Sequence, residues 1–135
     1  MVGYEWETKE SIRKVAGIAI SLPVDQLRIA YYVPFPGTAA YSRLKDRLFT
    51  DYEAFTTDTP AFEPDSMKVD ELKEEVKRAI VQFYNSSSYS KHVSSKISKH
   101  PRLKKSFDRF FAYLSDNKML SSSGQEILKR IANSI

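Results

Sequence analysis

Two short segments combine unusual backbone residues with polar side chains that could line a ligand site. Residues 3–8 read GYEWET and residues 34–38 read PFPGT. Each is expected to follow a strand and to lead into a helix capped by a threonine, Thr8 or Thr38. Free N–H groups at a helix start favour anions, and α/β proteins bind ligands at the carboxyl ends of strands. Any loop between a strand and a helix has these features, so the two segments alone are weak evidence for a site.

The composition excludes several other kinds of chemistry. The chain contains no cysteine, which excludes disulfides, thiolate nucleophiles and iron–sulfur clusters held by its own thiolates. Its two histidines, His92 and His100, are eight residues apart, a spacing at which they cannot share a metal ion without help. We interpret them as surface or capping residues. The sequence also lacks a Walker-type loop and a Ser/His/Asp arrangement, so no metal or nucleophilic site is expected in this chain.

The elements that would position the two segments are predicted to form a βαβ unit. Residues 1–3 are expected to end a strand, and apolar residues at helical spacing predict a helix over residues 9–22. Residues 26–33 have two largely apolar faces, which is typical of a parallel strand that is buried on both sides. Gly37 is expected to adopt a positive φ just before a helix over residues 39–48.

The rest of the chain is predicted to be mostly helical. Residues 49–66 are aperiodic but contain four aromatic residues, which indicates an ordered loop. Ser66 is expected to cap a helix that ends near Tyr84. Three further helices are expected, and their apolar positions are Tyr89, Val93 and Ile97 in the first, Leu103, Phe107, Phe110, Phe111 and Leu114 in the second, and Ile127, Leu128, Ile131 and Ile135 in the last.

Length and charge suggest the general class of protein. With 135 residues, 41% of them apolar and 28% charged, the chain has the size and composition of one globular domain. No apolar run is long enough for a membrane span and no signal peptide is evident, so we expect a cytoplasmic protein. Residues 86–118 contain eight Lys or Arg against two Asp, a charge of +6 within the total of +4. This basic stretch could meet phosphate, but the interpretation as a solvated helix face is favoured.

Three motifs in order resemble those of radical-SAM enzymes. Residues 3–12, GYEWETKESI, resemble the G-x-P-x-E-T-x-E-S/T-I segment after the fifth strand of the radical-SAM barrel. Residues 34–41, PFPGTAAY, resemble the P-x-P-G-T-x-x-Y segment after the sixth strand, and residues 51–55, DYEAF, resemble D-W/Y-x-x-F/Y. Residues 79–84 resemble the A-x-x-x-F-Y end of a following helix. The nearest subgroup is the cobalamin-binding radical-SAM proteins, which include the anaerobic magnesium-protoporphyrin IX monomethyl ester oxidative cyclases.

The resemblance implies an α/β fold, with residues 1–50 forming the last βα units of a parallel (β/α) barrel and residues 51–135 forming a helical C-terminal extension. It implies the C-terminal part of an enzyme of the oxidative cyclase, oxidoreductase or methyltransferase type that uses SAM and a [4Fe–4S] cluster, with cobalamin as a further candidate cofactor. The residues implied to line the SAM or substrate pocket are Gly3, Glu7, Thr8, Tyr32, Pro34, Phe35, Pro36, Gly37 and Thr38.

The chain also departs from the family pattern. The cobalamin domain and the C-x-x-x-C-x-x-C cluster loop are missing, and residues 4–6 read YEW where proline is usual. The chain alone should therefore be inactive and bind no cofactor, and the expected partner is the N-terminal part of the parent enzyme. Glu7 is either an acid near SAM or an acid that stabilises a helix start. The segment 34–38 is either a pocket wall or a stiff turn.

Two further expectations concern partners. A strand over residues 26–33 without neighbours would have unpaired edges, which favours a homodimer. The alternative function is a non-catalytic basic module whose helices, from Lys91 to Lys118, bind nucleic acid or another subunit. Nucleic acid is the less favoured partner, because the phenylalanines of this stretch fall at core spacing of a helix.

Overall fold

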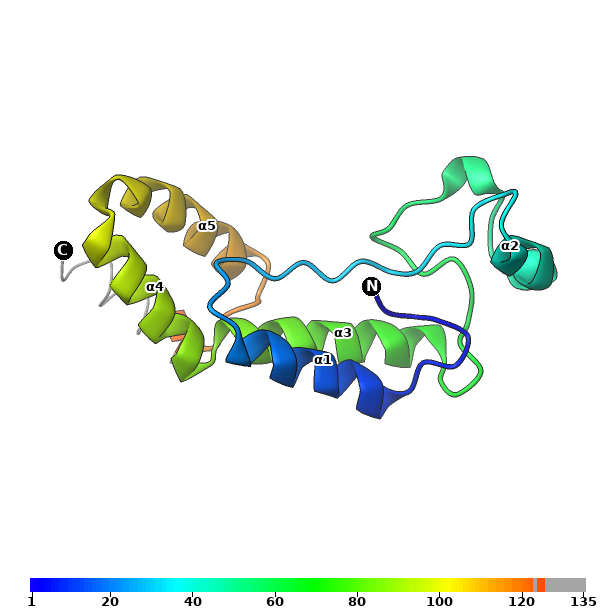
Figure 1. Cartoon of the computed structure of the whole chain (residues 1–135), viewed down its shortest axis with the longest axis horizontal. Coiled ribbons are helices and arrows are strands. Elements are labelled where there is room, and N and C mark those ends of the chain that lie inside the picture. The colour runs from blue at the N-terminus through cyan, green and yellow to red at the C-terminus, as the bar shows by residue number, and fades with distance from the viewer. Residues whose placement is uncertain (123, 126–135) are drawn as a thin grey trace. The chain divides into compact units, whose positions relative to one another are not determined.

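A computed structural model describes residues 1–122 and 124–125 of the chain, and these residues are mainly helical (Figure 1). The predicted final helix, over residues 127–135, lies outside the described residues. In the described part no helix has both the length and the apolar character that crossing a bilayer requires. The helices are α1 (Lys9–Ser21), α2 (Ala39–Leu44), α3 (Val69–Tyr84), α4 (Ser87–Lys99) and α5 (Lys104–Asp116), with short 3-10 helices η1 (Lys45–Arg47), η2 (Tyr52–Ala54) and η3 (Pro101–Leu103).

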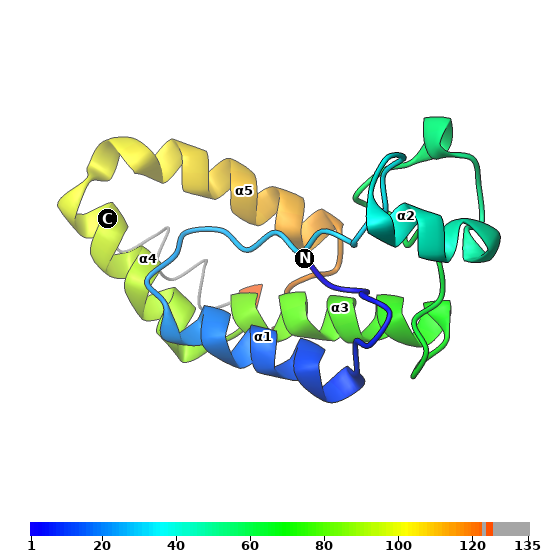
Figure 2. The ribbon, with the colours of Figure 1, turned by 45° about the vertical axis from the view of Figure 1, so that its right-hand side comes forward.

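The predicted α/β barrel fold is wrong for this chain. The described residues contain no strand and no sheet, and residues 26–33 run as an extended segment in both views (Figure 2). Their one β-type pairing is an isolated parallel bridge between Val2 and Tyr31. The physical reason is the lack of pairing partners, because a strand exists only through hydrogen bonds to its neighbours. Within the described residues, residues 1–3 pair with this segment at Val2 alone, which makes a bridge and not a ladder.

The described chain divides into two compact units. The first unit contains residues 1–13 and 28–76, and the second contains residues 14–27 and the residues from 77 onward. Helices α1 and α3 each contribute their N-terminal part to the first unit and their C-terminal part to the second.

The core of the first unit forms around the predicted ordered loop. Phe62 is 1% exposed and packs with Val33, Leu44 and Ala61, and Phe55 lies against the same cluster. This confirms that residues 49–66 are an ordered loop rather than a linker. The role predicted for Ser66 is wrong, since α3 begins only at Val69. The Ser66 hydroxyl donates instead to the backbone carbonyl of Glu7.

The core of the second unit confirms the predicted helical faces. Tyr89, Val93 and Ile97 of α4 are buried, as are Phe107, Phe111 and Leu114 of α5. These side chains form one cluster with Phe83 and Tyr84 of α3. Phe107 and Phe111 are therefore core residues, and the partly buried Phe110 packs against the same cluster, as expected of a helical core stripe.

Polar side chains join the chain segments of the second unit. The Tyr84 hydroxyl accepts from the Leu27 N–H at 2.9 Å and donates to the Leu27 carbonyl at 3.1 Å, and its burial raises its pKa. The Asn85 amide donates to the carbonyls of Val81 and Met119, and its oxygen accepts from the Ser121 N–H at 2.8 Å. The bonds of Tyr84 and of Asn85, the residue that follows α3, therefore tie residue 27 and residues 119–121 to the end of this helix, while the bond from Asn85 to Val81 stays within the last turn.

Asp25 connects the turn after α1 to two turns of α4. Its Oδ1 lies 2.9 Å from His92 Nε2, and its Oδ2 accepts a hydrogen bond from Lys96 Nζ. Partial burial acts to raise the pKa of Asp25, but the hydrogen bonds from Lys96 and His92 outweigh burial and lower it. The stability that this group contributes is therefore present above the ordinary aspartate pKa of about 3.9 and is lost as the pH falls through the lower folded value.

We expect Asp25→Asn to lower the free energy of unfolding at neutral pH by about 0.5–1 kcal/mol, because a partly exposed ion pair with two charge-assisted partners has that order of strength. The matched control is Asp58→Asn, which breaks the exposed ion pair between Asp58 and Arg28 and should have a smaller effect. Denaturant unfolding from pH 7 to pH 3 is the measurement, and the difference between wild type and Asp25→Asn should shrink as the pH falls. A difference that stays constant down to pH 3 would show that the carboxylate charge contributes nothing.

Candidate functional site

The two motif segments begin at the same place in the first unit. The Val2 N–H donates to the Ala30 carbonyl at 3.0 Å, and the Tyr32 N–H donates to the Val2 carbonyl at 2.7 Å. This pair of bonds is the parallel bridge, so residues 1–3 and 30–33 run in the same direction. Residues 3–8 and 34–38 therefore leave the bridge at the same end.

Each segment contains a glycine with a positive φ. Gly3 has a φ of +85° and Gly37 a φ of +86°, which confirms the expectation for Gly37. This conformation is open to glycine and strained for residues with a Cβ. A Cβ at Gly3 would also lie 3.2 Å from Cδ2 of the buried Leu72, whereas a Cβ at Gly37 would meet no atom within 4 Å.

Both segments then enter helices through the threonine caps that the sequence predicts. The Thr8 hydroxyl accepts from the Ser11 N–H at 3.1 Å, and the Ser11 hydroxyl accepts from the Thr8 N–H at 3.1 Å. This reciprocal arrangement is a capping box in which serine takes the usual place of glutamate. The Thr38 hydroxyl accepts from the Tyr41 N–H at 3.1 Å at the start of α2.

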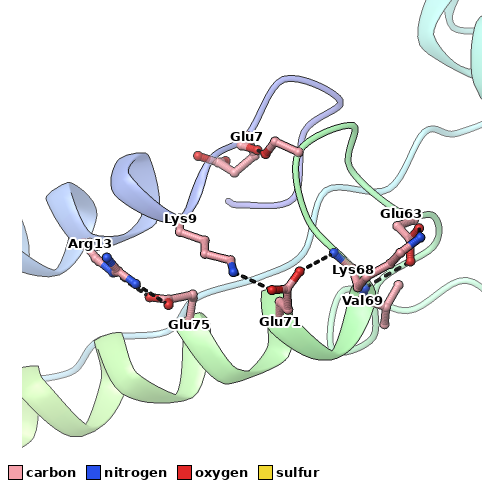
Figure 3. Close-up of polar contacts among 9 residues, drawn as sticks. Glu7, Lys9, Arg13, Glu63, Lys68, Val69, Glu71 and Glu75 are labelled. Atoms are coloured by element: carbon pink, nitrogen blue, oxygen red, sulfur yellow. Dashed lines mark hydrogen bonds and ion pairs between the residues drawn. The ribbon is translucent and has the colours of Figure 1, made fainter.

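Glu7 is buried beside the first of these caps. The residue is 8% exposed, and its carboxylate accepts a hydrogen bond from the Ser11 hydroxyl. Figure 3 shows Glu7 between the start of α1 and the loop that precedes α3. Of the two interpretations of this residue, the one as an acid that stabilises a helix start has a direct contact in its favour.

The other predicted pocket residues differ in exposure. Gly3 and Pro34 are buried with Glu7, and Tyr32 is half-buried. Phe35 is 55% exposed and packs edge-on against Phe55, with ring centroids 6.3 Å apart. The remaining exposed members are Thr8, Pro36, Gly37 and Thr38. The structure thus brings the two segments to one end of the bridge but leaves much of segment 34–38 facing solvent.

A stack of aromatic rings links the two segments, and the sequence analysis missed it. The Tyr4 ring stacks on Tyr32 with a centroid distance of 4.4 Å and on Trp6 with a centroid distance of 5.2 Å. Tyr32 and Phe62 pack edge to face, with ring centroids 6.3 Å apart. Trp6, at the open end, is 69% exposed. Strand-type spacing does not explain the stack, because a turn, closed by the hydrogen bond from the Glu7 N–H to the Tyr4 carbonyl at 3.0 Å, brings Trp6 onto Tyr4.

Two arginines of α2 and η1 lie near this stack and were also missed. Arg43 forms a 2.8 Å ion pair with Glu5, and this hydrogen bond and the charge of Glu5 raise the pKa of Arg43. Arg47 forms a 2.8 Å ion pair with Asp65, and its guanidinium lies 5.8 Å from the centroid of the Phe62 ring. The second distance is within range of a cation–π interaction. The aromatic stack therefore has a charged border, with both partners of each ion pair from the first unit.

Ion pairs between α1 and α3 hold the first segment in place (Figure 3). Arg13 makes two hydrogen bonds to Glu75, at 2.6 Å and 2.9 Å, and Glu75 is 5% exposed. Lys9 pairs with Glu71, whose other oxygen accepts from the Lys68 N–H at 2.9 Å at the start of α3. The hydrogen bond from Lys9 is the main cause that lowers the pKa of Glu71. Glu71 thus both caps α3 and holds α1.

The metal-ligating residues do not form a site in the described part of the chain. No group of three or more His, Asp or Glu side chains there is arranged to hold a metal ion. What the site offers chemically is an exposed aromatic surface, two ion pairs and two glycine turns at one end of a parallel bridge.

Comparisons with protein families, with curated proteins and with solved structures find no match to this chain.

Substitution of three glycines by alanine should separate backbone strain from packing. Gly3→Ala combines a positive φ with a close approach to Leu72, so we expect the largest loss, about 2–3 kcal/mol. Gly37→Ala introduces the backbone strain alone and should lower the free energy of unfolding by about 1 kcal/mol. Gly17→Ala, in the interior of α1 with open space around it, should gain about 0.5–1 kcal/mol.

Chemical denaturation of the three variants measures these changes. Equal losses for Gly3→Ala and Gly37→Ala would show that the contact with Leu72 relaxes without cost. An unchanged stability for Gly37→Ala would contradict the positive φ at that residue.

Proposed function

We propose that this chain is the C-terminal part of a radical-SAM enzyme and that segments 3–8 and 34–38 border the SAM or substrate pocket of the whole enzyme. The observation that carries the proposal is the parallel bridge between Val2 and Tyr31, with its two flanking hydrogen bonds. It supports the proposal because the two segments that resemble family motifs begin at one end of the bridge, as two neighbouring parts of one pocket must.

The residues of this chain do not fit the iron–sulfur cluster of such an enzyme. Clusters of this type are held by thiolates, and the chain has no cysteine. The ligands of the cluster would belong to the N-terminal part of the parent enzyme, which is the partner that this proposal requires. The role of this chain is therefore to shape and cover the pocket, and no step of the reaction is assigned to its side chains.

The aromatic stack gives this role a physical basis. The rings of Trp6, Tyr4 and Tyr32 offer an apolar surface that excludes water from whatever packs on it. Exclusion of water protects reactive intermediates from side reactions. The ion pair between Glu5 and Arg43 fixes the border of this surface, and the positive φ of Gly37 fixes the turn through which segment 34–38 enters α2.

The proposal is tested in the complete reading frame that contains this chain. We expect that reading frame to encode a C-x-x-x-C-x-x-C motif upstream of residue 1 and its product to cleave SAM to 5′-deoxyadenosine after anaerobic reconstitution with iron and sulfide. Gly37→Val should lower the rate of cleavage by about tenfold or more, because strain in this turn displaces a pocket wall. Gly17→Ala, remote from both segments in sequence and exposed in α1, is the control and should leave the rate unchanged. A reading frame without the cysteine motif would refute the proposal, as would full activity of Gly37→Val.

The isolated chain should bind no iron–sulfur cluster and should not cleave SAM, because it has no thiolate to offer. Reconstitution with iron and sulfide, an absorbance scan and an assay for 5′-deoxyadenosine form the measurement. A cluster absorbance band together with turnover of SAM would contradict this expectation.

A further inference from the structure

A cavity in the second unit lies where α4 ends and η3 begins. Its volume is about 520 Å³, within the range of small-molecule sites. The residues that line it are Lys96, Lys99, His100, Pro101, Arg102 and Leu103. Four of the six carry a basic side chain.

No acidic residue of the surrounding sequence offsets this charge. Residues 86–107 contain six Lys or Arg and no Asp or Glu. Lys96 is paired with Asp25, which comes from the turn after α1. Lys99 and Arg102 are exposed and form no ion pair within the described part of the chain. Two cationic side chains without an ion-pair partner in the described residues therefore line the cavity.

A purely structural role explains only part of this arrangement. Lysines in the last turn of a helix stabilise its negative end, which accounts for Lys96 and Lys99 of α4. Arg102 follows Pro101, after α4 has ended. The His100 N–H donates to the carbonyls of Lys96 and Ile97, at 2.9 Å and 3.2 Å, so two of the carbonyls that would repel an anion are already hydrogen-bonded.

We propose that this cavity binds a small molecule that carries a phosphate group. The planar guanidinium of Arg102 can donate two parallel hydrogen bonds to phosphate oxygens, and Lys99 adds a point charge beside it. His100 also lines the cavity, and its imidazole is a further residue type that can donate a hydrogen bond to phosphate. Pro101 and Leu103 give the cavity an apolar part for the organic portion of the ligand. A hollow of limited volume fits such a ligand better than it fits a polymer, which would need a continuous basic surface.

Titration calorimetry of the full chain with adenosine monophosphate in low-salt buffer tests the proposal, with inorganic phosphate and adenosine as comparison ligands. The double variant Lys99→Gln/Arg102→Gln should weaken binding of the nucleotide by about tenfold or more, since it removes the charge-assisted hydrogen bonds. Adenosine should bind far more weakly than the nucleotide, and inorganic phosphate should compete with the nucleotide. Circular dichroism checks that the variant keeps its helices.

The matched control removes the same charge elsewhere in the second unit. Lys91→Gln/Arg109→Gln replaces two exposed cations that do not line the cavity, on α4 and α5. It should weaken nucleotide binding by no more than about threefold, because charges outside the cavity act only through the screened field. Equal losses for both double variants would overturn the proposal, and so would wild-type protein that does not bind the nucleotide.

Titration with a single-stranded oligonucleotide tests whether the basic residues bind nucleic acid instead. If it binds much more tightly than the nucleotide, loses affinity steeply with salt and is weakened equally by both double variants, the basic residues form a nucleic-acid surface and the proposed small-molecule site is wrong. Weak binding of the oligonucleotide that Lys99→Gln/Arg102→Gln alone reduces would support the cavity as the site.

Discussion

The hydrogen bonds between Val2 and the residues on either side of Tyr31 fix the register on which the first unit depends. A parallel pairing of two backbones decides which residues advance together beyond it. Tyr4 then lies beside Tyr32, and the two glycine turns come at the same end. A shift of the pairing by one residue would turn each side chain to the opposite face and dissolve the aromatic stack. The other edge of the extended segment is also used, because the Tyr31 N–H donates to the Thr57 carbonyl at 2.8 Å.

This second bond also bears on the homodimer that the sequence suggested. That prediction assumed that residues 26–33 expose two unpaired edges. Val2 forms hydrogen bonds along part of one edge and Thr57 along part of the other, so residues of the same chain already pair with some of these backbone groups. The homodimer stays a prediction, but the unpaired backbone that would drive it is smaller than the sequence implied.

Features that depend on a short stretch of sequence could be predicted, whereas features that depend on distant residues could not. Helices α1, α4 and α5 could be predicted because a repeat of 3.6 residues is contained within the segment itself. The caps of Thr8 and Thr38 and the positive φ of Gly37 are equally local. The strand over residues 26–33 could not be judged in this way, because its existence depends on partners elsewhere. Ser66 shows the same limit, since a carbonyl 59 residues away takes its hydroxyl. The rings of Tyr4 and Phe62 and the arginines Arg43 and Arg47 join the candidate site only through such distant pairings.

The side-chain amide of Asn85 makes the second unit sensitive to a chemical change that leaves the shape of the residue almost intact. Its nitrogen donates to the carbonyls of Val81 and Met119, while its oxygen accepts from Ser121. Hydrolysis of this amide to a carboxylate replaces the donor by an oxygen that faces two carbonyl oxygens. The result is repulsion where two hydrogen bonds stood, in a part-buried position where a new negative charge is poorly hydrated. The slow ageing of one asparagine would thus break the link between residue 119 and the end of α3 and leave only the bonds from Ser121, with no peptide bond cut and no change in the size of a side chain.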